Sequence, residues 1–315
     1  MRILYIHNLY LAIYGCIRRS GLRRFGSKEE QGIRSMTRCP LCNSPAKRHL
    51  RLGHSSVWEC AAPYCGLQFA MPQLEEEQLR AAYTDLYYPD AEGCHTARCE
   101  NTPESVLTQG LGQIDAKFGP LIGKEILDYG CGAGSLSHVA IKCGARPVGV
   151  EPNPNARKAI RRAGLFPAYG SLEALQNDRG ESPFDFIFLW EVIEHLREPW
   201  RELAKLRKLL RPGGRIVIST PNASGLRARL LRRRWHNYTN PTHFYYFAPA
   251  SLRLALGTSG FEEIVQLHFA IRYPDHGAVR SAFHRVLLRS RLDGELLFTA
   301  SPGPSESLTH GNCSK

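Results

Sequence analysis

The sequence predicts an α/β protein in which helices flank an open, largely parallel sheet, with a small cysteine-containing module in front of it. A glycine-rich turn, Gly130–Gly134, stands between a short apolar strand and a helix. Segments typical of strands and of helices then alternate along the chain, as they do in α/β domains. Before them, four cysteines have the paired spacing of a metal-binding module: Cys39, Cys42, Cys60 and Cys65.

The composition excludes several classes of protein and narrows the choice of partner. The chain has 315 residues, 43% hydrophobic and 22% charged, unlike collagen, a disordered chain or a multi-span membrane protein. Its formal net charge of +12 suggests an anionic partner. Residues 1–35, with seven basic and two acidic side chains, supply +5, and five arginines in Arg227–Arg234 supply as much again. The charge therefore predicts a local anionic contact, and nucleic acid is disfavoured as a partner.

The segments outside the two predicted modules are interpreted as extensions and linkers. Ile3–Ile17 is apolar but only fifteen residues long, shorter than the ~20 that cross a bilayer, and its flanking charges do not match a secretory signal. We expect residues 1–35 to form a basic and apolar extension, with an interfacial anchor as the alternative. Residues 73–104 predict a short amphipathic helix and a linker, and residues 301–315 a disordered tail.

Residues 36–72 predict a small module resembling a zinc ribbon. Cys39 and Cys42 form a C-x2-C pair, and Cys60 and Cys65 form a C-x4-C pair after seventeen intervening residues. Four thiolates on two turns can close a tetrahedral Zn²⁺ site and so stabilise a module without a large core. We expect a structural ion, because four cysteines leave no open position for a substrate. The alternative is a set of buried thiols without metal.

An acidic residue, three glycines and a second acidic residue predict a nucleotide site. Asp128 precedes Gly130, Gly132 and Gly134, and Glu151 ends the next expected strand. Glycine lets the backbone turn sharply and approach a ligand at a helix N-terminus, and a carboxylate at a strand end accepts hydrogen bonds from ribose hydroxyls. The dinucleotide fingerprint G-x-G-x-x-G fails, because serine occupies its last position, so a nucleotide-dependent oxidoreductase is disfavoured.

Over residues 105–300 these motifs resemble the class I S-adenosylmethionine-dependent methyltransferases. FDFIFLWEV at Phe184–Val192 resembles the fourth strand of that family, and LLRPGG at Leu209–Gly214 resembles the turn into its fifth. Asn240–Glu262 resembles the helix and sixth strand of the branch with quinone-biosynthesis O-methyltransferases and sugar or natural-product methyltransferases, and Gly294–Ala300 resembles a last strand. The resemblance implies a Rossmann-like, seven-stranded sheet with flanking helices.

The resemblance also implies a cofactor and an activity. A four-cysteine module precedes the domain in some members of this branch, notably sugar C-methyltransferases. The implied activity moves a methyl group from S-adenosylmethionine to an oxygen or carbon of a small metabolite, sugar or lipid-linked intermediate. A catalytically silent scaffold with the same fold is the rival interpretation. The cofactor-binding residues implied by the resemblance are Asp128, Gly130, Gly132, Gly134 and Glu151, with Leu172 and Trp190 as neighbours.

Glu191, Glu194 and His195 follow the expected fourth strand, where substrate would meet cofactor, and three interpretations stay open. In the first, His195 is a general base for a hydroxyl and Glu194 orients it. In the second, these three residues, joined by His243, hold a divalent metal that binds a catecholate, similar to ubiquinone O-methyltransferases and small-RNA 2′-O-methyltransferases. In the third, the acids cap the helix that begins near Leu196, and His195 packs against a neighbour.

Gly225–Asn240 predicts a basic helical segment, and the resemblance implies that it is an insertion that covers the substrate. Its leucines have helical spacing among five arginines, and we expect Trp235 and Tyr238 to add aromatic surface. Such a segment can contact anionic lipid head groups or the diphosphate of a polyprenyl or nucleotide-sugar substrate. A solvated basic helix without a partner is the alternative. The metal-ligand spacing of the cysteines favours a reducing compartment, so we expect a cytoplasmic protein, with peripheral membrane contact as an addition.

Overall fold

The structure is a computed structural model, and it describes residues 37–52, 55–83, 104–180, 182–268 and 294–304. The predictions for the extension at residues 1–35, for most of the linker and for the end of the tail lie outside the described residues. None of the helices within the described ranges is long and apolar enough to cross a membrane.

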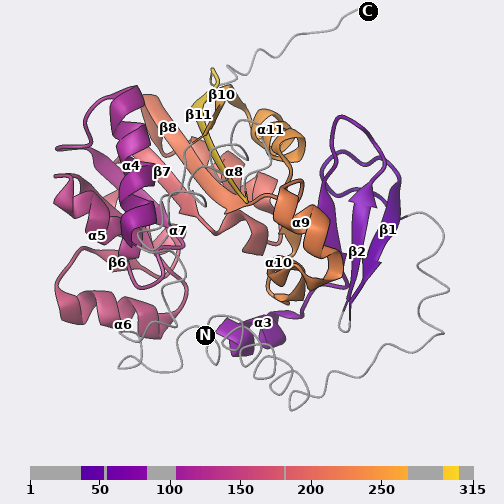
Figure 1. The fold of residues 1–315 in the computed structure, drawn as a ribbon. Helices are drawn as coiled ribbons and strands as arrows, with labels where there is room; N and C mark the ends of the chain where they lie inside the picture. Colours follow the sequence, from indigo (N-terminus) through magenta and orange to yellow (C-terminus); the bar gives the residue numbers. More distant parts are fainter. Residues whose placement is uncertain (1–36, 53–54, 84–103, 181, 269–293, 305–315) are drawn as a thin grey trace, which may run out of the picture.

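A seven-stranded mixed sheet forms the larger part of the protein, as predicted (Figure 1). Its spatial order is β10-β11-β8-β7-β4-β5-β6. The strands from β8 to β6 pair in parallel, and β11 is antiparallel to both of its neighbours. The strands are β4 (Glu125–Tyr129), β5 (Arg146–Val150), β6 (Ala168–Tyr169), β7 (Phe184–Trp190), β8 (Leu210–Pro221), β10 (Phe261–Leu267) and β11 (Glu295–Pro302).

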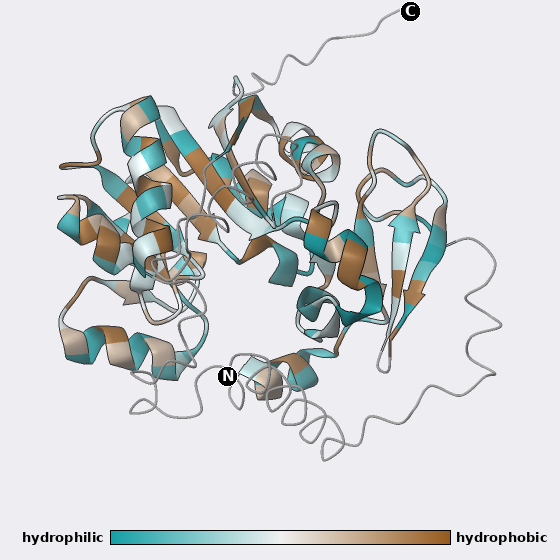
Figure 2. Ribbon diagram, viewed as in Figure 1, coloured by the Kyte–Doolittle hydropathy of each residue, from teal (hydrophilic) through white to brown (hydrophobic). Residues whose placement is uncertain are grey.

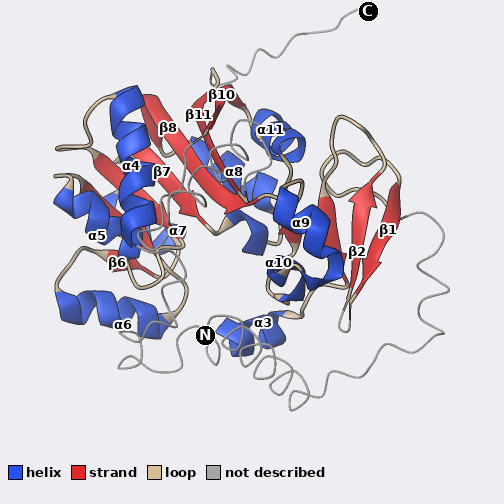
Figure 3. Ribbon diagram, in the orientation of Figure 1, coloured by secondary structure: helices blue, strands red, loops and turns tan. Residues whose placement is uncertain are grey.

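Helices cover both faces of this sheet (Figure 3). Along β7, Phe186 and Phe188 join the apolar cluster on one face, while Ile187 and Leu189 join the cluster on the other. A strand buried on both faces is apolar over most of its length, and Phe186–Trp190 of β7 forms such a continuous apolar run after Asp185. On one side lie α4 (Glu104–Phe118) and α5 (Ser135–Lys142); on the other lie α7 (Leu172–Arg179), α8 (Pro199–Arg207) and α11 (Pro249–Thr258); α6 (Pro154–Ala163) contacts β6 at the sheet edge.

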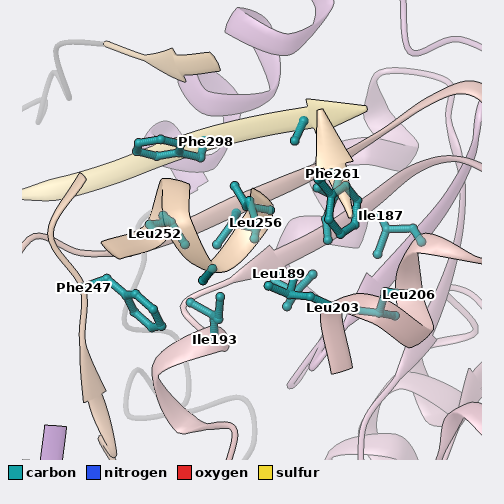
Figure 4. Close-up of a cluster of buried hydrophobic side chains, with 14 of the residues drawn as sticks. Ile187, Leu189, Ile193, Leu203, Leu206, Phe247, Leu252, Leu256, Phe261 and Phe298 are labelled. Atoms are coloured by element: carbon teal, nitrogen blue, oxygen red, sulfur yellow. The ribbon is translucent and has the colours of Figure 1, made fainter. Parts of the chain in front are cut away.

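The cluster under α8 and α11 extends beyond the large sheet (Figure 4). Leu203 and Leu206 of α8 and Leu252 and Leu256 of α11 pack there against strand residues. The same cluster contains three of the four paired cysteines, and Phe247 belongs to it as well. The core of the sheet and the cysteine module are therefore continuous.

The predicted turn at Leu209–Gly214 is wrong in one respect, because most of it belongs to β8. Leu210 pairs with Phe184 and Arg215 pairs with Phe186, so the residues between them form an irregularity inside the strand. A Cβ on Gly214 would lie 2.9 Å from the backbone oxygen of Phe184. The glycine thus serves the close approach of two strands rather than a separate turn.

A second, four-stranded antiparallel sheet contains the cysteine module, and it reaches beyond the predicted boundary of residues 36–72. Its order is β1-β2-β3-β9, and the last strand comes from the larger domain. Strand β2 ends at Cys60 and β3 begins three residues after Cys65, so the second cysteine pair lies at the turn between them. The strands are β1 (Ala46–Arg51), β2 (Ser56–Cys60), β3 (Gln68–Met71) and β9 (Tyr245–Tyr246), and the predicted helix after them is α3 (Glu76–Ala82).

The basic insertion forms short helical turns beside this small sheet: α9 (Leu226–Leu231), η4 (Arg232–Arg234) and α10 (His236–Thr239). The expectation that Trp235 and Tyr238 add aromatic surface is wrong, since each is only 2% exposed. They pack with Val57, Ala70 and Tyr246 in a cluster shared with the module. Hydrophobic and hydrophilic residues alternate along α9 (Figure 2), and Leu230 is 71% exposed.

Candidate active site

The glycine turn after β4 has a backbone that other residues rarely adopt. Gly130, Gly132 and Gly134 have φ angles of 77°, 54° and 91°, in the left-handed region that favours glycine. A Cβ on Gly130 would lie 2.6 Å from Cγ2 of Val192, in the loop after β7. The turn therefore packs directly against the segment that contains Glu191, Glu194 and His195, called the E-x-x-E-H residues below.

Glu151 closes the turn from the end of β5. One carboxylate oxygen accepts a hydrogen bond from the backbone N–H of Gly132 at 3.0 Å, and the other accepts from that of Asn153 at 2.8 Å. Burial raises the pKa of Glu151 above its usual value. An ionised carboxylate offers about four acceptor positions, so about two remain for the hydroxyls of a ligand.

Asp128 lies beneath the turn, almost without solvent contact. It is 2% exposed, and its Oδ2 accepts a hydrogen bond of 2.7 Å from the hydroxyl of Ser137. Burial raises the pKa of Asp128 to about 6, and the charge of Glu151 adds to the effect. The predicted cofactor residues are thus brought together from β4, the turn and β5.

The two predicted neighbours of the cofactor lie at the ends of other elements. Leu172 is the first residue of α7 and is 7% exposed within the core cluster. Trp190 ends β7 and is half-buried. Its ring fills the space beside Gly110 of α4, where a Cβ would lie 2.4 Å from Cη2 of the indole. A contact of either residue with a cofactor stays a prediction.

The E-x-x-E-H residues lie on a tight turn after β7. Glu191 has a φ of 56°, which is strained for a residue with a side chain. Its carboxylate accepts a hydrogen bond of 2.9 Å from the hydroxyl of Ser219 on β8 and is also hydrogen-bonded to Glu295 of β11. Burial raises the pKa of Glu191 to about 7. Backbone strain of this kind persists only where the surroundings hold it, as here between two strands.

Glu194 is buried next to this turn with one oxygen unpaired. It is 1% exposed, and its Oε2 accepts a hydrogen bond of 2.9 Å from Thr220. Its Oε1 has no partner among the described residues. Burial, together with the charge of Glu191, holds the pKa of Glu194 well above its usual value. A buried carboxylate oxygen without a donor is costly unless a ligand or cation completes it.

His195 and His243 meet at the same point from distant parts of the chain. Nδ1 of His195 lies 3.0 Å from the backbone oxygen of Thr242 and 3.1 Å from its hydroxyl. Thr242, rather than Glu194, therefore orients the ring. When Nδ1 carries the proton and donates it to Thr242, Nε2 keeps its lone pair. The rings of His195 and His243 are perpendicular with centroids 4.5 Å apart, and Nδ1 of His243 is buried with no partner in the described structure.

These three side chains form a group that can hold a metal ion. The candidate ligand atoms of Glu194, His195 and His243 all lie within 4.8 Å of one another. Burial lowers the pKa of His195 to about 4 and that of His243 well below its usual value, so both rings are neutral and can ligate. Glu191 is not part of this group, although the sequence suggested it as a ligand.

The capping interpretation of the E-x-x-E-H segment does not fit this geometry. Residues Ile193–His195 form a 3₁₀ turn, and α8 begins only at Pro199. The N-cap residue of α8 is Glu198, which makes no side-chain cap. Glu194 is bound to β8 instead. The acids therefore face the turn and the strands, and the base and metal interpretations stay open.

The four cysteines of the N-terminal module converge as the sequence predicted. Sγ of Cys39 lies 3.8 Å from that of Cys65, and Sγ of Cys42 lies 3.4 Å from that of Cys60. All four sulfur atoms lie within 4.8 Å of one another. A hydrogen bond from Cys65 lowers the pKa of the Cys39 thiol to about 5, while the same bond raises the pKa of Cys65. The donor set and its spacing suit a structural zinc ion.

Sequence reasoning missed the hydroxyl and aromatic partners of these groups. The hydroxyls of Ser137, Ser219, Thr220 and Thr242 each bond a predicted site residue. Such residues have no period or spacing that marks them, because their partners lie 9 to 47 positions away in the chain. The ring of Tyr83, just after α3, lies 6.1 Å from that of His195, centroid to centroid.

Comparisons with known proteins agree with this arrangement. Residues 111–267 match the profile of a family described as a methyltransferase domain. Over 171 residues the chain is 33% identical to a ubiquinone biosynthesis O-methyltransferase of Azorhizobium caulinodans, covering 50% of this chain and 66% of the relative. Over 118 residues it is 36% identical to the protein of that name from Aeromonas salmonicida, covering 36% of this chain and 49% of the relative. The chain thus spans about half to two thirds of the length of these relatives.

A solved structure has the same fold. It is a chain of the complex between the Haloferax volcanii Trm112 methyltransferase activator and a methyltransferase, with a TM-score of 0.51 and 16% identity. The match covers 72% of this chain and 98% of that chain. Together with the strand order and the glycine turn, the matched profile and the relatives show that this chain belongs to the class I S-adenosylmethionine-dependent methyltransferases.

Proposed function

We propose that the chain transfers a methyl group from S-adenosylmethionine to an oxygen of a small acceptor molecule. The observation that carries this proposal is the contact between the two halves of the site, where Val192 packs on Gly130. A methyl donor in the glycine turn would therefore lie next to the residues of the E-x-x-E-H turn. An oxygen acceptor is favoured over a carbon because the similar relatives are named O-methyltransferases.

The residues around the glycine turn fit the methyl donor. Glu151 keeps about two acceptor positions for the hydroxyls of a ribose. Buried Asp128 lies in β4 just before the turn, where a cationic ligand would favour its ionised form. The absent side chain at Gly130 lets Val192 pack directly against the backbone of the turn. These residues would bind and orient the donor rather than take part in covalent chemistry.

Methyl transfer itself demands alignment and a deprotonated acceptor. The donor supplies a methyl group on a sulfonium: the new C–O bond forms as the C–S bond breaks, and the electron pair of that bond stays on sulfur. The hydroxyl proton needs an acceptor, and Nε2 of neutral His195 is suited to it, since Thr242 occupies the other nitrogen. The ring is half-buried, which limits competition from water.

A metal-assisted form of the same reaction is the second candidate. Two buried atoms without a partner in the described structure, Oε1 of Glu194 and Nδ1 of His243, favour it. With His195 they would hold a divalent cation, which lowers the pKa of a hydroxyl that binds to it. We further propose that the four cysteines hold a structural Zn²⁺ ion.

The acceptor, we propose, is presented at an anionic surface such as a lipid head group. The turn region Arg227–Arg234 supports this, because five arginines surround Leu230 and Leu231, which are 71% and 40% exposed. Apolar side chains framed by arginines suit the boundary of an anionic membrane. A lipid-linked acceptor would meet the site there. A peripheral, cytoplasmic location is part of this proposal.

Calorimetry with S-adenosylhomocysteine tests the central proposal. We expect the wild-type chain to bind it, the Glu151→Ala variant to lose at least tenfold in affinity, and Gly112→Ala to match wild type. Gly112 lies on α4, and an added Cβ there would have no atom within 4 Å, so Gly112→Ala introduces an alanine away from the site without a steric clash. Absence of binding, or equal binding by Glu151→Ala, would overturn the proposal. A silent scaffold would bind but show no turnover with any phenol or catechol offered.

A further inference from the structure

The sheet of the cysteine module continues into the larger domain beside Glu194, His195 and His243, which form the second half of the site, or second half-site. Strand β3 pairs with β9, where Gln68 faces Tyr246 and Phe69 faces Tyr245. The backbone N–H of Ala70 extends this ladder by donating to the oxygen of Phe244 at 2.9 Å. The segment that follows His243 is therefore the outermost strand of the module's own sheet.

The opposite edge of that segment contacts the E-x-x-E-H turn. The backbone N–H of Phe244 donates to the oxygen of Glu194 at 2.8 Å, and the hydroxyl of Tyr245 donates to the oxygen of Arg197 at 2.8 Å. Phe244 is thus hydrogen-bonded on one side to β3 and on the other to Glu194. His243, one residue before it, is placed by both.

Helix α3 and the residue after it, which follow the module in the chain, also contact the E-x-x-E-H turn and its neighbours. Nε of Arg197 lies 3.5 Å from the carboxylate of Glu76 in α3, and its guanidinium lies over the ring of Phe244 at 5.2 Å from the centroid. Tyr83, at the end of α3, brings its ring to 6.1 Å from that of His195. Two separate parts of the N-terminal region therefore contact residues of the second half-site.

The second cysteine pair, Cys60 and Cys65, lies just before β3, the strand that pairs with β9. Cys60 ends β2, and its N–H donates to the oxygen of Leu67 at 2.9 Å, immediately before β3. Cys65 precedes Leu67 by two residues and is fully buried. An ion held by these thiolates would fix the register of β2 and β3, because it ties both ends of the turn between them. Through β3 it would fix Phe244 and His243.

We propose that the four-cysteine module is a positioning part of the second half-site. Its metal ion holds β3, β3 holds Phe244, and this holds His243 and Glu194 within reach of His195. The glycine turn, which binds no residue of the module in the described structure, keeps its shape without it. This inference rests on the proposed function, and it adds that loss of metal from the module disables the acceptor half of the site while donor binding persists.

Two variants separate the module from the rest of the fold. Cys65→Ser removes one thiolate, and Ala70→Pro removes the N–H that donates to Phe244 while keeping all four cysteines. Cys143→Ser, at an exposed thiol outside the cluster, is the matched control for the serine change. Each protein is assayed for zinc content, for S-adenosylhomocysteine affinity, for Mn²⁺ binding by electron paramagnetic resonance, and for histidine ¹⁵N shifts by NMR.

We expect both variants to shift the signals of His195 and His243 and to weaken Mn²⁺ binding at least tenfold, with affinity for S-adenosylhomocysteine within threefold of wild type. The control should match wild type in every measurement. Unchanged histidine signals in a zinc-free protein would overturn the inference, as would a parallel loss of donor binding in both variants. Where wild type binds no Mn²⁺, the histidine signals decide alone. Failure of wild type to bind S-adenosylhomocysteine contradicts the proposed function instead.

Discussion

Substituting the buried aspartate beneath the glycine turn should make the ligand-free protein more stable. Asp128 is 2% exposed, and its carboxylate accepts a hydrogen bond from Ser137. In Asp128→Asn the amide oxygen can accept the same bond, and the shape is conserved. The substitution removes only the cost of an ionised group in a buried position, so we treat its effect as electrostatic.

The magnitude follows from the shift in pKa. Burial raises the pKa of Asp128 from 3.8 to about 6 in the folded protein. The folded state therefore holds more protons than the unfolded state between these values, and stability falls as pH rises through that window. The cost to wild type is about 2 kcal/mol near pH 5 and about 3 kcal/mol at pH 8. Asp128→Asn should recover up to these amounts, because it has no charge at any pH.

Urea unfolding of wild type and variant between about pH 5 and pH 8, without ligand, measures this difference. We expect the stability gain of the variant to grow by about 1 kcal/mol across that range, while its affinity for S-adenosylhomocysteine falls at least tenfold. Glu151 contributes to this difference, because its charge helps to raise the pKa of Asp128, whereas acids that do not interact with Asp128 cancel in the comparison. A variant less stable than wild type at pH 8, or a gain that does not change with pH, would contradict this prediction.

Three further predictions concern the turn, the module and the basic segment. Gly130→Ala should lose donor binding and about 1–2 kcal/mol of stability, measured by calorimetry and urea unfolding, because it forces a left-handed φ and a contact with Val192; unchanged binding contradicts this. Purified protein should contain about one zinc per chain by mass spectrometry, lost in Cys60→Ser; a zinc-free, equally stable wild type contradicts it. Leu230→Asp should abolish sedimentation with phosphatidylglycerol vesicles without affecting donor binding; retained sedimentation contradicts that.

Much of the fold was predictable because its signals are local. The strand and glycine turn around Asp128, and the largely apolar β7, occupy continuous stretches whose residue types match their backbone and burial. The two cysteine pairs, which begin at Cys39 and at Cys60, can be recognised from their spacing alone. These elements could be placed without knowledge of any distant contact. The number of strands came from the family resemblance instead, and their order from the structure.

Other predictions failed where burial depends on a distant neighbour. Trp235 and Tyr238 have the composition of an exposed basic segment, but Tyr238 donates to Gln68 of β3 and is buried against it. Leu210 begins a strand that the glycines seemed to preclude, since the close approach at Gly214 is visible only from the neighbouring strand. In both cases the deciding partner lies far away in the sequence.

The fold class, the glycine turn and the cysteine cluster could be predicted because each depends on residues a few positions apart. The side chains that complete the second half of the site meet through contacts between distant parts of the chain. The tertiary structure joined His243 to Glu194 and His195, and it paired Thr242 with His195 across 47 positions. It also made the two-residue strand β9 part of the module's sheet. A strand that short has no period to recognise, and hydroxyl partners have no spacing, so both are set by packing alone.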